Sequence, residues 1–155
     1  MIVWHSRTGA SEQLAWAAAD GAGDRALLVA AAAAEPDHLL GASGYLFICP
    51  ENLGSMSGLM KEMFDRCYYP LLGRIEGRVY ATITAAGSDG SNAVRQLDRI
   101  VTGWRLRRVA EAVIVNLEAQ TPEAILADKA VPQAKLQEAR ELGEALAEGL
   151  ASGIF

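Results

Sequence analysis

The sequence predicts an α/β domain in which helices cover both faces of a five-stranded parallel sheet. Short apolar runs alternate with amphipathic stretches along the whole chain of 155 residues. The apolar runs show little polar alternation, which is typical of strands that are buried on both faces. Strands separated by helical crossovers form parallel sheets, and a chain of this length normally folds as one domain. We therefore expect a single domain over residues 1–155.

Five apolar runs are expected to be the strands of this sheet. They are short, and glycine, proline or polar residues bound most of them. No change in composition and no internal repeat suggests a boundary between them. The expected strands are Ile2–Trp4, Ala26–Ala30, Tyr45–Cys49, Val79–Thr84 and Val109–Val115.

Helices are expected in the stretches between these strands. The crossover after the second strand leaves room only for a short helix, which has Pro36 in its first turn. Met60, Met63 and Phe64 have helical spacing and are expected in the core. In the last helix, leucines at 136, 142, 146 and 150 and Ala139 form one apolar stripe. The expected helices are Ser11–Gly21, Pro36–Leu40, Gly58–Tyr69, Asn92–Gly103, a short one after Thr121-Pro122, and Pro132–Leu150.

Composition excludes several classes of function. The chain is 51% hydrophobic and 21% charged, which excludes a disordered polar tail. Its net charge of −5 argues against nucleic acid or an acidic membrane as the main partner. The longest apolar run, Ala26–Ala34, is about half of what a membrane span needs, and no export signal is seen at the N-terminus, so we expect a cytoplasmic protein. Cys49 and Cys67 are expected to be reduced and buried, and no set of metal ligands is present.

The first strand is followed by a segment that suits an anion. In an open parallel sheet, ligands bind beyond the carboxyl ends of the strands. The segment His5–Ser11 has three hydroxyl side chains and Gly9, and it leads directly into a helix. Free N–H groups at a helix start favour a phosphate group. The structural alternative is that Thr8 or Ser11 simply caps the helix.

Two known nucleotide motifs do not apply. The chain has no G-x-x-x-x-G-K-[ST] sequence, so it is not a P-loop protein. The segment Gly21–Ala26 matches the letters of the dinucleotide fingerprint, but it follows a helix and precedes a strand. We interpret it as a helix end followed by a turn.

Two further segments contribute to the predicted site. Pro50–Gly58, after the third strand, can present backbone groups to the edge of a flat heterocycle, with Leu53 and Met56 over the ring; alternatively it is only a wide turn. Ala85–Ser91, after the fourth strand, is expected to close the far side of the same crevice. Asp89 is expected to cap the next helix.

At these three segments the chain resembles the flavodoxin-like FMN proteins. Ser6-Arg-Thr-Gly-Ala-Ser11 is similar to the flavodoxin phosphate signature, hydroxyl-x-Thr-Gly-x-hydroxyl. Pro50-Glu-Asn-Leu-Gly-Ser55 resembles the Pro-Glu-x-x-Gly-Ser segment of NAD(P)H-dependent FMN and quinone reductases. That segment precedes a helix with Leu-Lys and a later Asp, where this chain has Lys61 and Asp65 with Met60 before the lysine.

The resemblance implies a flavodoxin-like fold and FMN as the cofactor. The phosphate would be bound by the first segment, and the flavin ring would lie between the other two. It implies no catalytic side chain, because hydride passes directly between stacked rings. The implied FMN-binding residues are Ser6, Arg7, Thr8, Gly9, Ala10, Ser11, Pro50, Glu51, Asn52, Leu53, Gly54, Ala85, Ala86, Gly87 and Ser88.

The resemblance implies an oxidoreductase that takes electrons from NAD(P)H and passes them to a quinone-like or other small electrophilic acceptor. The alternatives are a flavodoxin-type electron carrier, a non-catalytic flavin-binding module, or loops that hold no flavin. The absence of aromatic residues at the ring segments favours a reductase, and family members often form homodimers. The five arginines at 95, 99, 105, 107 and 108 are expected to be solvated, with an acidic partner or the NADPH adenosine phosphate as alternatives.

Overall fold

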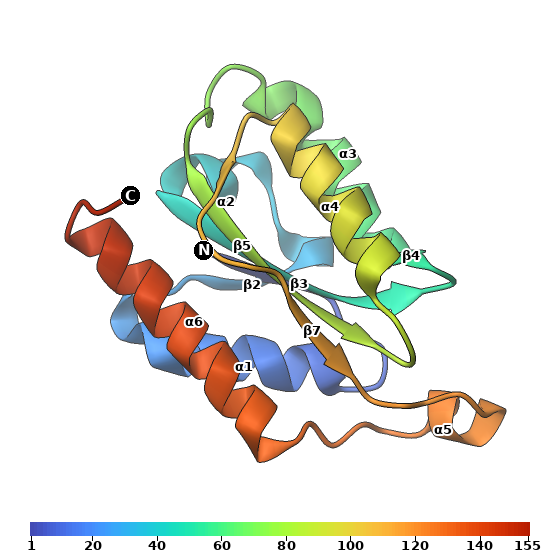
Figure 1. Ribbon diagram of the computed structural model, residues 1–155. Coiled ribbons are helices and arrows are strands. Elements are labelled where there is room, and N and C mark those ends of the chain that lie inside the picture. The colour runs from blue at the N-terminus through green and yellow to red at the C-terminus, as the bar shows by residue number, and fades with distance from the viewer.

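The computed structural model describes all 155 residues and confirms the α/β class with a mainly parallel sheet. The strand order is β2-β1-β3-β5-β6, with β7 also paired to β5 and the short β4 antiparallel to β3 (Figure 1). The first four expected strands are confirmed, although β2 begins two residues later than expected and β3 and β5 extend further at their carboxyl ends. The strands are β1 (Ile2–Trp4), β2 (Leu28–Ala30), β3 (Gly44–Asn52), β4 (Ser55–Met56), β5 (Val79–Ala86), β6 (Arg107–Arg108) and β7 (Val113–Asn116).

All six expected helices are present, with ends that differ from the sequence-based bounds by at most two residues. Gly23, with φ of 60°, follows the first helix and leads into a 3-10 turn, Gly23–Arg25, so the Gly21–Ala26 segment is a helix end and turn as expected. A second 3-10 turn covers Ala31–Ala33. The helices are α1 (Ala10–Ala22), α2 (Pro36–Gly41), α3 (Gly58–Leu71), α4 (Ser91–Gly103), α5 (Pro122–Leu126) and α6 (Gln133–Ala151).

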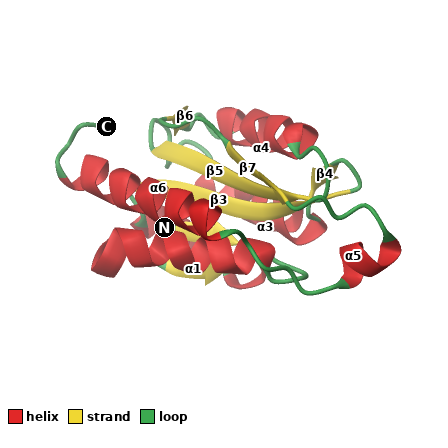
Figure 2. Ribbon diagram, turned by 60° about the horizontal axis from the view of Figure 1, so that its bottom comes forward, coloured by secondary structure: helices red, strands yellow, loops and turns green.

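The sheet lies between two helical layers (Figure 2). On one face, α1 and α6 cover a core that includes Leu46, Ile48 and Ile83. On the other face, α3 and α4 cover a core that includes Phe47 and the expected core residues of α3. Successive side chains of β3 therefore point to opposite faces of the sheet and are buried in different cores, as is typical of parallel strands covered on both faces.

Two glycines allow α1 and α6 to pack closely. A Cβ atom on Gly21 would lie 2.0 Å from the carbonyl oxygen of Arg140, and one on Gly143 would lie 2.0 Å from that of Ala18. The expected apolar stripe of α6 faces this contact, with Ala139 and Leu146 buried. This helix pair fixes the position of α1, whose first turn follows the predicted phosphate segment.

The expected fifth strand, Val109–Val115, is wrong as one continuous element. Val79 and Tyr80 of β5 pair with β6, whereas Ile83 to Ala86 pair with β7. Two residues of β5, 81 and 82, separate these two sets of pairs, whereas four residues, 109–112, separate β6 from β7. The two extra residues interrupt the pairing between the segment and β5.

The strand order places three carboxyl ends side by side. The chain crosses in one direction from β1 to β2 and in the other from β2 to β3, so strand order reverses between β1 and β3. Trp4 pairs with Ile48 and Pro50 pairs with Ala85. The three predicted segments follow these neighbouring strands, at the position where open α/β sheets bind ligands.

Candidate functional site

The segment after β1 forms a tight loop at the start of α1. Gly9 is the N-cap residue of α1 and has φ of 86°, a conformation that favours glycine. The Gly9 amide donates to the Ser6 hydroxyl at 3.1 Å. The alternative interpretation, a cap by Thr8 or Ser11, is wrong, because no side chain caps this helix.

This loop leaves a group of hydrogen-bond donors unused. The amides of Ser6, Arg7, Thr8, Ala10, Ser11 and Glu12 donate to no backbone carbonyl. The Ser11 side chain is only 1% exposed, and its hydroxyl has no hydrogen-bond partner. Buried polar groups are normally paired, so this hydroxyl and the free amides fit an anion such as a phosphomonoester.

A distant segment, which sequence reasoning missed, supports this loop from outside. The Lys129 amide donates to the Thr8 carbonyl at 2.7 Å. The Gln13 side-chain amide donates to the carbonyls of Gly9, at 3.1 Å, and Lys129, at 2.6 Å, and its oxygen accepts from the Val131 amide at 3.2 Å. Gln13 thus joins the loop to the chain before α6. Its separation of 116 residues from Lys129 left no local sequence signal.

The segment after β3 is a β-hairpin, and its alternative interpretation as a wide turn is wrong. Glu51 pairs with Met56 and Asn52 pairs with Ser55, so only Leu53 and Gly54 form the turn. Both have positive φ, 53° and 69° respectively. Two such residues are required by a type I′ turn, in which leucine is unusual.

The two apolar side chains expected over a ring have different positions. Met56 is buried in the core between the sheet and α3, so the expectation that it covers a ligand is wrong. Leu53 is fully exposed at the tip of the hairpin. Its strained backbone and exposed side chain indicate a role outside the folded core.

Helix α4 holds the hairpin in place through polar contacts. The Gln96 side-chain oxygen accepts from the Ser55 hydroxyl at 2.6 Å and from the Met56 amide at 2.9 Å. The Asn92 side chain donates to the Gly54 carbonyl. At the other end of the hairpin, the Glu51 carboxylate accepts from the Gly90 amide at 2.9 Å. The hairpin and the start of α4 therefore form one connected unit.

The segment after β5 lies between this unit and the chain after β7. Gly87 is required by close packing, since a Cβ atom there would lie 2.7 Å from the Ala119 carbonyl oxygen. The expected cap by Asp89 is wrong: Gly90, with φ of 82°, precedes α4, and the Asp89 carboxylate accepts from the Ser91 hydroxyl instead. The amides of residues 87–89 donate to no backbone carbonyl.

His5 links the first two segments. Its Nδ1 atom lies 2.8 Å from the hydroxyl of Ser57, the fully buried residue that precedes α3. Burial, and secondarily the charge of Arg7, lowers the pKa of His5, which favours the neutral imidazole. Burial raises the pKa of the nearby Cys49 thiol to about 12, so this cysteine is not a nucleophile.

Together these contacts bring the three predicted segments into one site at the carboxyl edge of the sheet. His5 and Ser57 connect the first segment to the second, and Glu51 and Gly90 connect the second to the third. Arg7 is the one cationic side chain of the first loop, and it is exposed and forms no ion pair.

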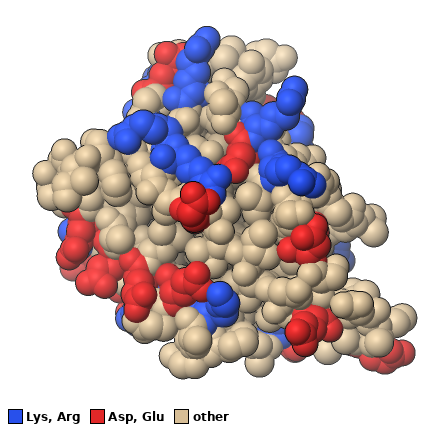
Figure 3. Space-filling view, viewed as in Figure 1, with Lys and Arg blue, Asp and Glu red and all other residues tan.

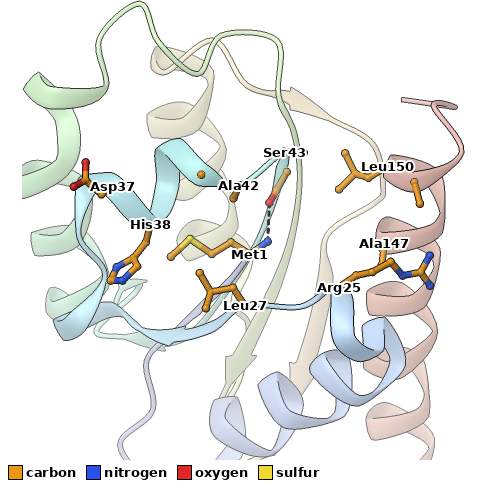
Figure 4. Close-up of a pocket in the computed structure, with 12 residues that line it drawn as sticks. Met1, Arg25, Leu27, Asp37, His38, Ala42, Ser43, Ala147 and Leu150 are labelled. Carbon is orange, nitrogen blue, oxygen red and sulfur yellow. Dashed lines mark hydrogen bonds between the residues drawn. The ribbon is translucent and has the colours of Figure 1, made fainter.

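Two further cavities are present, one far from this site and one beside its first loop. One of about 500 Å³ is at the amino edge of the sheet, between α2, the end of α6 and the segment before β2 (Figure 4). Leu27, Ala147 and Leu150 line it, and Arg25 and His38 stand at its border. The other, of about 670 Å³, follows α1 and α6 beside Trp16. Gly9 and Glu12, at the start of α1, border this second cavity, whereas neither the hairpin nor residues 85–88 line either one.

Comparison with protein families decides the classification. Residues 28–120 match the model of the NADPH-dependent FMN reductase family. The chain belongs to this family. As a family member it is a flavoprotein oxidoreductase whose cofactor is FMN and whose family donor is NADPH. The match includes the hairpin and the segment after β5, and it begins after the loop Ser6–Ser11.

Solved structures confirm the flavodoxin-like fold of this FMN reductase family member. A WrbA-like flavodoxin from Agrobacterium tumefaciens is 22% identical with a TM-score of 0.75, over 97% of this chain and 96% of that one. A flavodoxin from the domain Archaea is 15% identical with a TM-score of 0.76, over 97% and 96% of the two chains. A search of curated proteins finds no match. None of the helices is both long and apolar enough to cross a membrane.

Proposed function

We propose that this family member, as one domain over residues 1–155, takes electrons from NAD(P)H and passes them through FMN to a quinone-like acceptor. In this proposal the loop Ser6–Ser11 holds the FMN phosphate. Pro50–Gly54 and Ala85–Ser88 border the ring on its two sides. The proposal places the protein in the cytoplasm, where its nicotinamide donor is available.

The observation that carries this proposal is the group of unused donors at the start of α1. Six free amides and the buried, unpartnered Ser11 hydroxyl lie within one loop and the first turn of α1, and no group of the protein accepts from them. Hydrogen bonds to a charged acceptor contribute about 1.5–3 kcal/mol each. A few of them are enough to hold a phosphate without a lysine.

The remaining residues orient the ring and its charge. When bound, FMN supplies a ring that accepts a hydride and gives up electrons to a second molecule. The free amides of residues 87–89 are available to donate to negative charge at the ring edge, and their positions are fixed by Gly87 packing and by the Asn116 side chain on the Ser88 carbonyl. Donors that are already in place stabilise such charge without reorganisation.

The absence of aromatic side chains at the hairpin favours a reductase. Residues 50–54 and 85–88 contain no aromatic residue, which leaves one face of a ring open for a nicotinamide to stack on and then leave. An electron carrier needs only an exposed ring edge. The two functions therefore differ in their reaction with NADPH.

Anaerobic mixing separates these alternatives. The FMN-loaded protein should lose its flavin absorbance rapidly with NADPH or NADH, and a quinone should restore it. The same protein should show no stable affinity for NADPH after the FMN is removed. Bleaching by dithionite but by neither nucleotide would replace the reductase with a flavodoxin-type carrier or a flavin-binding module.

A further inference from the structure

Residues 91–110 carry a charge opposite to that of the rest of the chain. They contain five arginines, one aspartate and no lysine or glutamate. The other residues contain nine basic and eighteen acidic side chains. A local charge of +4 thus lies on a protein whose net charge is −5.

The five arginines form one surface, which we call the arginine face: Arg95 and Arg99 on α4, Arg105 in the following turn, and Arg107 and Arg108 on β6. All five are exposed. Figure 3 shows basic side chains gathered over α4 and β6 and acidic ones over α1 and α6. The molecule is therefore electrically asymmetric across this view.

Only two arginines of the arginine face form ion pairs within the protein. Arg108 pairs with Asp98 at 3.1 Å and with Glu111 at 3.0 Å, which ties β6 to α4, and Arg105 pairs with Glu76 at 3.1 Å. Arg95, Arg99 and Arg107 form no ion pair. Arg95 and Arg99 are one helical turn apart, where like charges destabilise a helix. Their presence is therefore not explained by the stability of α4.

The arginine face begins beside the proposed flavin site. Arg95 lies on α4 between Asn92 and Gln96, the two residues that hold the hairpin. Its guanidinium donates to the Asn92 side-chain oxygen at 3.4 Å. From there the face follows α4 to β6 at the edge of the sheet, so a molecule seated on it also borders the hairpin.

We propose that the arginine face is a docking surface for a small acidic protein, with surface carboxylates paired to Arg95 and Arg99. Guanidinium groups bind carboxylates in a two-pronged geometry that lysine lacks. From Arg95 to the end of α4 the arginine face extends about 12 Å and then continues to β6, which suits several carboxylates on a protein rather than one phosphate group. Nucleic acid is disfavoured by the acidic remainder of the surface. The docking is independent of flavin binding, whereas its use for electron exchange rests on the function proposed above.

The test uses plant-type [2Fe–2S] ferredoxin, a small acidic protein, as the probe. Binding to the full chain, with and without FMN, is measured by interferometry at 20 and 200 mM salt. We expect at least tenfold weaker binding at the higher salt concentration. Arg95→Glu/Arg99→Glu should weaken binding at least tenfold at 20 mM salt, and Arg95→Lys/Arg99→Lys should weaken it less.

The matched control is Arg25→Glu/Arg140→Glu, which makes the same change in charge on the α1 and α6 side of the molecule. It should change binding less than threefold. Absence of ferredoxin binding at 20 mM salt, or equal weakening in the control variant, would overturn the proposal. It would also be overturned if Arg95→Glu/Arg99→Glu raised the KM for NADPH and left ferredoxin binding unchanged. Binding is measured without FMN as well, so the docking surface is tested even if the proposed flavin reaction is not found.

Discussion

At the scale of single residues, His5 connects two segments of the candidate site through its contact with Ser57. The imidazole lies between the phosphate loop and the hairpin, and its Nδ1 atom is 2.8 Å from the Ser57 hydroxyl. Burial lowers its pKa below the ordinary value of 6.5, so the folded protein favours the neutral ring. This difference between the folded and unfolded states makes stability depend on pH.

We expect the free energy of unfolding to fall as pH is lowered through and below 6.5, the unfolded pKa of His5. In that range the unfolded chain binds a proton at His5 more readily than the folded protein does, which favours unfolding. Urea unfolding between pH 7.5 and 5 should show a shallower decrease for His5→Gln than for the wild type. His38→Gln, which keeps His5, is the control. Parallel curves for His5→Gln and the wild type would contradict this role.

At the scale of elements, the sequence predicted the site segment Pro50–Gly58 and the helix Asn92–Gly103, but neither the hairpin conformation nor the contacts between the hairpin and α4. The positions of the main strands and helices follow from apolar runs and helical spacing. The hairpin gave no such signal because β4 has only two residues and its turn contains Leu53 where Asn or Gly is usual. Both helix starts at the site use a glycine with positive φ instead of the expected polar cap, at Gly9 and Gly90.

Contacts between residues far apart in the sequence account for the other features of the structure that the sequence did not predict. The three segments could be placed at one edge from the predicted parallel sheet alone, since carboxyl ends of parallel strands share an edge. Gln13 and Gln96, in contrast, act on residues 116 and 40–41 positions away, and no local pattern marks such pairs. The break between β6 and β7 was missed because Val109 and Ala110 continue the apolar run, although neither belongs to a strand.

Gln96→Ala should loosen the hairpin. It removes the acceptor of two hydrogen bonds, from Ser55 and Met56, and leaves a buried amide unpaired. We expect a loss of about 1–3 kcal/mol in the free energy of unfolding and several-fold weaker FMN binding. Gln96→Glu keeps the acceptor oxygen and should restore most of both quantities. Gln137→Ala, at an exposed position of α6, is the control. Equal effects of the two alanine variants would contradict the role of Gln96 in holding the hairpin.

At the scale of the whole molecule, the exposed tip of the hairpin favours association. Leu53 is fully exposed in a turn that Asn92 of α4 contacts, and its positive φ is unfavourable for leucine, which favours a role for the exposed side chain in a contact. We expect a homodimer in which Leu53 contacts the partner. Sedimentation at micromolar concentration should show a dimer for the FMN-loaded wild type and a monomer for Leu53→Asp. A wild-type monomer with FMN bound would contradict this assembly.

In the proposed function, the loop Ser6–Ser11 holds the phosphate of FMN. The free amides and the unpartnered Ser11 hydroxyl predict that the phosphate group supplies a large part of the binding free energy. The most direct measurement is titration of the FMN-free protein with FMN, riboflavin and FAD, followed by flavin fluorescence. We expect FMN to bind at least about tenfold more tightly than riboflavin, since one charged hydrogen bond alone contributes about 1.5 kcal/mol. Thr8→Ala should weaken FMN binding and leave riboflavin binding unchanged, whereas equal affinity of the wild type for FMN and riboflavin would contradict the phosphate site.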